Sequence, residues 1–175
     1  MSEYKMLERK LMYQGKILSA YQEKLQFPNG QVATRDLIEQ VDAVAILAIT
    51  ESDQVIIVKQ YRDGAREELL EIPAGLIDEG EEPITSAKRE LLEETGCIAE
   101  NWQEVASFYA SPGSVTSRTT LFVATNLKMV SEQSLDEHEF VEISTMPLSK
   151  FLSTPFKDAK TLIATRYALE YSLRK

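Results

Sequence analysis

Two segments in the middle of the chain are almost continuously apolar. Residues 41–50 read VDAVAILAIT, and residues 54–61 read QVIIVKQY after a short polar turn. Runs of this length, rich in β-branched side chains, are typical of strands that are buried on both faces of a sheet. The pattern therefore predicts two buried strands.

Shorter apolar runs continue towards the C-terminus. They predict further strands at residues 69–75, 102–110, 120–127 and 140–144. A short helix is predicted at 147–153, and apolar side chains at helical spacing predict a terminal helix over 158–173. The elements together predict an α/β sandwich, in which a mixed sheet has a helix on each face.

The N-terminal segment has a different pattern. Residues 16–27 place apolar side chains on one parity, the turn signal PNG follows at 28–30, and residues 31–40 return as a second strand. An isolated β-hairpin is only marginally stable in water, so it needs a partner surface in its own domain or in a second subunit. We therefore divide the chain into a β-rich segment, 1–42, and a main domain, 43–175.

An acidic loop and a helix follow the third predicted strand. Pro83 suits the first turn of a helix, where its missing N–H is harmless, and Gly96 suits the helix end. Ile84, Ala87 and Leu91 recur at i, i+3 and i+7 and form an apolar stripe that can pack on a sheet. We expect this face of the helix to be buried.

The same helix carries three carboxylates on a neighbouring face. Glu90, Glu93 and Glu94 lie at i, i+3 and i+4. Like charges so placed destabilise a helix by roughly 0.2–0.5 kcal/mol per pair, whereas a magnesium ion binds hard oxygen ligands of this kind. Arg89 can reach Glu93 at i+4 and hold that carboxylate. Taken alone, the cluster indicates either a solvated helix surface or a cation site.

Composition and charge exclude several classes of function. The chain has 175 residues and a formal net charge of −9, which argues against broad contact with nucleic acid or anionic membranes. A phosphate substrate would need local cations, from arginines or a metal. The single cysteine, Cys97, excludes an intramolecular disulfide and a cysteine zinc site. The absence of a signal-peptide core and of a run of about 18 apolar residues favours a cytoplasmic location.

The acidic helix belongs to a longer pattern of fixed spacing. Its fixed positions are Gly75, Glu81, Arg89, Glu90, Glu93, Glu94 and Gly96. Five residues separate the first two, seven separate the second from the third, and an apolar residue closes the pattern. The pattern resembles the signature of the Nudix hydrolases. That resemblance implies a Nudix-type α/β/α sandwich with a mixed β-sheet, plus the N-terminal antiparallel β-hairpin region.

Two further segments resemble the ADP-ribose pyrophosphatase branch of that family. They are KQYR at 59–62, followed by LLEIPAG, and YASPG at 109–113. The resemblance implies magnesium-dependent hydrolysis of ADP-ribose to AMP and ribose 5-phosphate, with manganese as a substitute cation. A water molecule would attack one phosphorus, and the other phosphate would leave.

The resemblance also implies roles for single residues of the acidic helix and the strand before it. The metal ligands would be Glu90, Glu94 and the backbone carbonyl of Ala74. Glu93 and Arg89 would act with them in catalysis. Glu81 would support this group from outside.

Substrate contacts follow by the same matching. Arg62 matches an arginine near the substrate phosphates in relatives, although by itself it reads equally well as a surface arginine at a strand end. Pro112 and Gly113, in the YASPG segment, are the other candidates in the main part of the chain. Arg35, in the hairpin, would reach the substrate only from a second subunit.

At the general base the sequence departs from the family pattern. Many relatives carry a glutamate shortly after SPG, but here the stretch is SVTSR. The next acidic stretch contains Glu137 and Glu139, spaced as in relatives that place the base in this loop. We expect Glu137 to be the base and Glu139 an additional metal ligand; the alternative is a solvated acidic loop.

Three functions and two assemblies stay open at this point. The functions are hydrolysis of ADP-ribose, hydrolysis of another nucleoside diphosphate derivative (a different nucleotide sugar, a dinucleotide or an oxidised nucleotide), and non-catalytic binding of a nucleotide sugar. The resemblance implies a homodimer with exchanged N-terminal strands. The alternative is a monomer in which the hairpin folds back on its own sheet.

Overall fold

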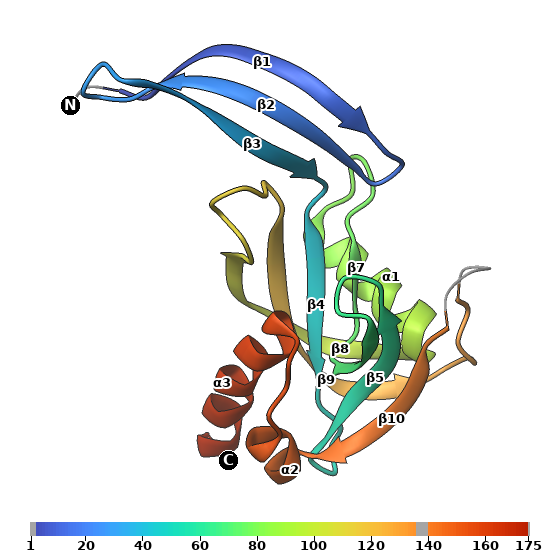
Figure 1. The fold of residues 1–175 in the computed structure, drawn as a ribbon. Coiled ribbons are helices and arrows are strands. Elements are labelled where there is room, and N and C mark those ends of the chain that lie inside the picture. Colours follow the sequence, from blue (N-terminus) through green and yellow to red (C-terminus); the bar gives the residue numbers. More distant parts are fainter. Residues whose placement is uncertain (1–2, 136–139, 175) are drawn as a thin grey trace. The chain divides into compact units, whose positions relative to one another are not determined.

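The computed structural model describes residues 3–135 and 140–174. Within these ranges the strands are β1 (Lys5–Gln14), β2 (Leu18–Gln26), β3 (Val32–Gln40), β4 (Ala43–Ala48), β5 (Gln54–Arg62), β6 (Glu67–Glu71), β7 (Ala74–Leu76), β8 (Cys97–Tyr109), β9 (Arg118–Met129) and β10 (Glu142–Pro147). The helices are α1 (Pro83–Thr95), α2 (Leu148–Ser153) and α3 (Ala159–Leu173) (Figure 1). The chain forms two compact units, one of Met1–Asp42 with Tyr109–Arg118 and one of Ala43–Phe108 with Thr119–Lys175.

The first unit contains an antiparallel sheet in the order β1-β2-β3. The predicted hairpin corresponds to β2 and β3, and the amide of Gly30 donates to the carbonyl of Phe27 in the turn between them. The prediction missed β1. Each of its ten residues is exposed, so no alternation of buried and exposed positions marks it in the sequence.

The second unit contains two sheets, in the orders β7-β4-β9-β8 and β10-β5-β6. Strand β4 pairs parallel to β9, with Val44 opposite Thr120, and antiparallel to β7, with Ala45 opposite Ala74. This four-stranded sheet is therefore mixed, as predicted. The other sheet is antiparallel.

Alternate residues of β4 enter two different apolar clusters. Ala45 and Leu47 pack in a cluster with side chains from α2 and α3, whereas Val44 and Ile46 pack in a cluster with side chains from α1. Successive side chains of a strand point to opposite faces, so β4 is covered on both sides. Figure 1 shows α1 and α3 on opposite sides of β4, which is the predicted sandwich.

Helix α1 begins and ends where the sequence predicts. Pro83 occupies its first turn, and Ala87 and Leu91 are fully buried. Gly96 adopts a left-handed backbone with φ of 67°. A Cβ at Gly96 would also lie 2.1 Å from the carbonyl oxygen of Ser131, so this position requires glycine twice over. The cap fixes where α1 ends, and with it the positions of the carboxylates in its last turns.

Candidate active site

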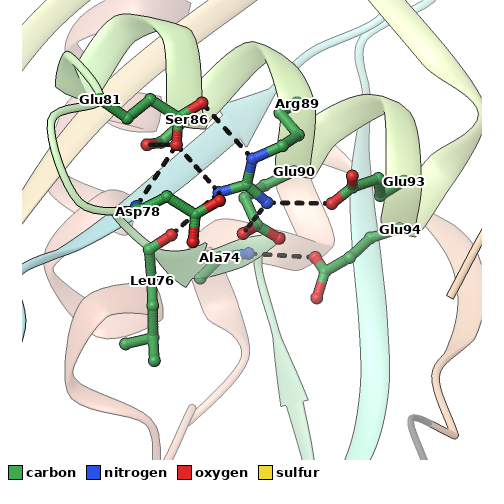
Figure 2. Close-up of polar contacts among 9 residues, drawn as sticks. All are labelled: Ala74, Leu76, Asp78, Glu81, Ser86, Arg89, Glu90, Glu93 and Glu94. Carbon is green, nitrogen blue, oxygen red and sulfur yellow. Dashed lines mark hydrogen bonds and ion pairs between the residues drawn. The ribbon is translucent and has the colours of Figure 1, made fainter. Parts of the chain in front are cut away.

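The acidic face of α1 lies against strand β7 (Figure 2). A Cβ built at Gly75 would come within 2.0 Å of the carboxylate of Glu90. Only a glycine leaves room for the carboxylate at this point of the strand. The glycine at the start of the sequence pattern is thus explained by its contact with a glutamate of the helix.

Glu94 is the most buried carboxylate of the cluster, with 4% of its surface exposed. The amide N–H of Ala74 donates to Glu94 Oε2 at 3.0 Å. The two residues were both predicted as metal ligands, and the structure brings them together through this amide. Burial of a carboxylate is costly unless hydrogen bonds or opposite charges compensate it.

Arg89 joins the carboxylates of the helix and the loop. Its guanidinium donates to Glu90 Oε1 at 2.7 Å and to Glu93 Oε2 at 3.0 Å, and the second contact is the predicted i,i+4 pair. It also contacts Glu81, and it donates to the carbonyl of Leu76 at 3.0 Å. Burial lowers the pKa of Arg89, but the hydrogen bonds and charges of these carboxylates outweigh it and raise the pKa. Arg89 therefore stays charged and holds three acidic groups in one arrangement.

Glu81 supports the cluster from the loop before α1. It accepts hydrogen bonds from the Ser86 hydroxyl at 2.5 Å and from the Asp78 amide at 3.4 Å, in addition to Arg89. The hydrogen bond from Arg89, followed by that from Ser86, lowers the pKa of Glu81. The sequence placed Glu81 near the helix start; its bond to Arg89 depends on how the loop folds.

The donor chemistry of this cluster fits a magnesium ion. The carboxylates of Glu81, Glu90 and Glu93 contact one guanidinium, and Glu94 adds a fourth carboxylate on the same helix, so the local charge is negative. The described residues contain no group of three or more His, Cys, Asp or Glu side chains that could hold a metal ion by themselves. Mg²⁺ usually takes one or two carboxylates and keeps several waters or substrate oxygens, so a smaller protein set suffices.

Arg62 lies in the same compact unit and is held by a buried acid. Its Nε donates to Glu71 Oε1 at 2.8 Å and its Nη2 to Glu71 Oε2 at 2.5 Å. The hydrogen bonds to Glu71 raise the pKa of Arg62, and the negative charges of Asp158 and Glu94 add to this effect. Arg62 is therefore more constrained than an ordinary arginine at a strand end.

Other predicted site residues belong to the first unit or lie outside the described ranges. Arg35 is exposed on β3, and its guanidinium stands 5.4 Å from the ring centre of Phe27. Pro112 and Gly113 are exposed in a turn of the same unit. The predicted base and the predicted extra ligand, Glu137 and Glu139, fall in the range 136–139, outside the described residues.

Sequence reasoning did not find three polar residues that contact the predicted site residues or their partners. Glu71 and Lys160 form an ion pair, although 89 positions separate them in the chain. Gln133 donates from Nε2 to the backbone carbonyl of Glu94 at 2.5 Å. Glu71 carried one usable signal, a charged residue inside the apolar run LLEIPAG; the other two carried none.

Comparisons with known proteins agree with this geometry. A family model described as NUDIX domain matches residues 39–165. The chain is 38% identical over 170 residues to "ADP-ribose pyrophosphatase" of Bacillus subtilis (strain 168), covering 94% of this chain and 92% of the relative. It is 35% identical, with the same coverage, to "Methanol dehydrogenase activator" of Bacillus methanolicus. A solved structure entitled "Crystal structure of ADP compounds hydrolase" superimposes with a TM-score of 0.83 at 25% identity, covering 98% of this chain and 95% of that one.

Proposed function

This chain belongs to the Nudix domain family, and from that premise we propose that it is an enzyme that hydrolyses ADP-ribose to AMP and ribose 5-phosphate. The bond broken is the phosphoanhydride bond between the two phosphates. The main support is that the carboxylates of Glu90 and Glu94 lie against β7. The chain also matches an ADP-ribose pyrophosphatase over almost its whole length.

We propose Glu90, Glu94 and the carbonyl of Ala74 as the ligands of a magnesium ion, with manganese as a substitute. When bound, such an ion shields the negative charge of a diphosphate and lowers the pKa of a coordinated water. The residues of the chain supply the geometry: Gly75 leaves space for Glu90, and the amide of Ala74 orients Glu94. Arg89, which is paired with Glu93, holds the Glu90 carboxylate in its orientation.

We propose Arg62 as the residue that binds a phosphate of the substrate. The protein carries a net charge of −9, so an anionic substrate needs local cations. Arg62 has 39% of its side chain exposed, and it is charged at every working pH. Pro112, Gly113 and, from a second subunit, Arg35 are proposed as further substrate contacts.

We propose Glu137 as the general base and Glu139 as an additional metal ligand. The support is the sequence alone, because SVTSR after SPG has no acid and the next acidic stretch contains these two residues. Replacing a base lowers kcat more than substrate affinity. Glu137→Gln is therefore expected to bind ADP-ribose and turn it over slowly. Full activity in this variant, with Glu139→Gln or Glu81→Gln inactive, would transfer the role to that residue.

We propose a homodimer that exchanges N-terminal strands, and a cytoplasmic location. The dimer is supported by β1, which exposes Met6, Leu11, Met12 and Tyr13 on one strand. No helix in the described part of the chain is both long and apolar enough to cross a membrane. Cell fractionation would test the location.

The experiment that tests the proposed function is a substrate panel with magnesium. ADP-ribose, other nucleotide sugars, dinucleotides and oxidised nucleotides are incubated with the enzyme, and the released nucleoside monophosphate is measured. ADP-ribose is expected to have the highest kcat/KM. Preference for another compound would favour a Nudix hydrolase of different specificity, and no turnover of any of them would favour a binding module.

A further inference from the structure

We propose that Glu71 is a positioning residue that holds the Arg62 guanidinium in the orientation needed to bind the diphosphate of the substrate, with Lys160 from α3 as the second partner of this carboxylate. This inference rests on the proposed function only in requiring a substrate with a diphosphate. It assigns a role in the site to a residue outside the sequence pattern, and to the C-terminal helix.

The geometry around Glu71 is a carboxylate clamped by two cations. Arg62 donates from Nε to one carboxylate oxygen and from Nη2 to the other, at 2.8 and 2.5 Å. Two parallel bonds of this kind fix the plane of a guanidinium as well as its position. Lys160 Nζ donates to the second of these oxygens. The arrangement leaves Nη1, with its two N–H donors, outside the paired bonds.

The burial of Glu71 argues for function over stability. Its surface is fully buried, whereas the Arg62 side chain is 39% exposed. Apolar residues of similar volume often stabilise a protein as well as a buried ion pair does, because the charges lose their water. A buried acid that grips a partly exposed arginine therefore suggests that the exposed end of the arginine is what is being positioned.

Helix α3 fixes the position of Lys160 independently of Arg62. Asp158 caps the helix by accepting from the amide of Thr161 at 2.9 Å, and it also contacts Lys160 Nζ at 3.1 Å. The amide of Ile72, the residue after Glu71, donates to the hydroxyl of Thr161 at 3.0 Å. The start of α3 is thus hydrogen-bonded to the segment that carries Glu71.

The charge of one glutamate of the acidic helix, Glu94, also acts on Arg62. Among the causes that raise the pKa of Arg62, the charge of Glu94 acts together with those of Glu71 and Asp158. Arg62 and Lys160 both contact the carboxylate of Glu71, and Asp158 contacts Lys160, so two cations and two carboxylates balance within the group. The accessible positive charge is that of Arg62, whose side chain is 39% exposed. A diphosphate that binds a cation at Glu90 and Glu94 would meet this positive charge with its remaining oxygens.

A double-mutant cycle on binding of inorganic pyrophosphate tests the proposal. Binding is measured by titration calorimetry, with magnesium present, for the wild type, Glu71→Gln, Arg62→Ala and the double variant. We expect each single change to weaken binding by about tenfold and the double variant to be no weaker than Arg62→Ala, because coupled residues are not additive. Losses that multiply in the double variant would overturn the proposal, and so would a wild type that does not bind pyrophosphate.

A second variant keeps the test decisive if Glu71→Gln does not fold. Arg62→Lys keeps the positive charge at an accessible site but cannot form two parallel bonds to Glu71. We expect it to lose as much pyrophosphate affinity as Arg62→Ala. Near-normal affinity would mean that charge alone suffices and would overturn the positioning role.

The matched control is the exposed ion pair between Lys157 and Glu67 in the same unit, in which Lys157 Nζ lies 2.7 Å from Glu67 Oε2. Glu67→Gln is expected to leave pyrophosphate binding unchanged. Turnover of ADP-ribose by the wild type is measured separately, so the two ideas can fail independently. If Glu71 and Arg62 are coupled in pyrophosphate binding but ADP-ribose is not turned over, the substrate assignment is refuted. If ADP-ribose is turned over but the two residues are not coupled, the role of Glu71 is refuted.

Discussion

Arg89 shows how much of the site depends on single side chains. One guanidinium contacts carboxylates before, beside and one turn after it, from Glu81, Glu90 and Glu93. Without such a cation, the like charges on α1 would repel one another and the carboxylates would spread into solvent. Glu94 is fixed differently, by burial and by the amide of Ala74. The residues thus divide into those held by charge and those held by the strand.

The first prediction concerns the proposed metal ligands. Glu90→Gln or Glu94→Gln removes a charge but keeps the shape, and the new side-chain oxygen in Glu94→Gln could still accept from the Ala74 amide. We expect turnover to fall by about 100-fold or more, since changes to outer-shell partners alone cost about 10–100-fold. The free energy of unfolding should change little or rise without metal. The measurement is kcat across a magnesium titration.

Glu82→Gln is the matched control, because Glu82 is an exposed residue at the start of the same helix and its side chain forms no cap. It should keep normal turnover. A Glu94→Gln protein with near-normal turnover at saturating magnesium would disprove the metal assignment.

The second prediction concerns the contact between strand and helix. In Gly75→Ala the new methyl group would lie 2.0 Å from the Glu90 carboxylate, so the carboxylate must move. It is the end of a flexible side chain, and we expect the free energy of unfolding to change by about 1 kcal/mol or less. Turnover should fall at least about tenfold, because small displacements of a catalytic group are costly.

Gly64→Ala serves as the comparison for Gly75→Ala, since a Cβ there meets nothing within 4 Å. Activity and urea unfolding are measured for both proteins. Equal activity in the two variants would mean that Glu90 does not need its observed position.

At the scale of elements, α1 and β7 together form the site. Pro83 and Gly96 fix the two ends of the helix, and Ala87 and Leu91 fix the face that packs. Because the apolar face of α1 is packed and both ends of the helix are fixed, its acidic face can point only towards β7. The loop before the helix adds Glu81, so part of the support for the acidic face comes from outside the helix.

The third prediction follows from the lowered pKa of Glu81. An acid whose pKa is lower in the folded than in the unfolded state stabilises the fold above its unfolded pKa of about 4.3. That contribution is lost as the pH falls through the lower, folded pKa. The difference in unfolding temperature between wild type and Glu81→Gln should therefore be full at pH 7 and shrink below about pH 4.

Thermal unfolding of both proteins from pH 7 to pH 3 measures this difference. A gap that stays constant with pH would show that Glu81 contributes no charge-dependent stability. Glu79→Gln provides the comparison, since Glu79 is an exposed acid in the same loop.

At the scale of the whole molecule, the chain is two compact units with different surfaces. The second unit buries its apolar residues in two clusters around β4. The first unit leaves apolar side chains of β1 exposed, and an exposed apolar strand is normally covered by another chain or element. A two-fold dimer would cover it with its own copy.

The fourth prediction is the mass in solution. Light scattering at micromolar concentration should give about twice the 19.8 kDa of one chain. Leu11→Lys places a charge on the exposed apolar strand and is expected to shift the mass towards one chain. Lys10→Gln, at the neighbouring exposed position, should leave it unchanged. A wild-type mass near that of one chain would rule out the dimer.

Shared sites can be tested by mixing two variants. An Arg35→Ala subunit is combined with an inactive Glu94→Gln subunit, and exchange of subunits is verified. If Arg35 serves the partner's site, mixed dimers regain one site that lacks both changes. No regained activity would show that each site is built from one chain.

The sequence by itself determined most of the strands around the site and the residues of the acidic helix. It was wrong in predicting one strand at 69–75, where the structure has β6 and β7 in two different sheets. Continuous apolar runs mark strands buried on both sides, and fixed spacing on a helix places Arg89 next to Glu93 whatever the fold. Turn and cap residues such as Pro83 and Gly96 act locally, so their effect is visible in the sequence. These features depend on neighbours within about one helical turn or one strand.

Only the tertiary structure decided which distant residues meet. Three contacts join residues that have no periodic relation in the chain. They are the ion pairs of Glu71 with Arg62 and Lys160, the close approach of Glu90 to Gly75, and the hydrogen bond from Gln133 to the backbone of Glu94. Strand β1 was missed because its exposed residues carry no burial pattern. Contacts of this kind arise from sheet order and packing, and a single sequence has no local signal for either.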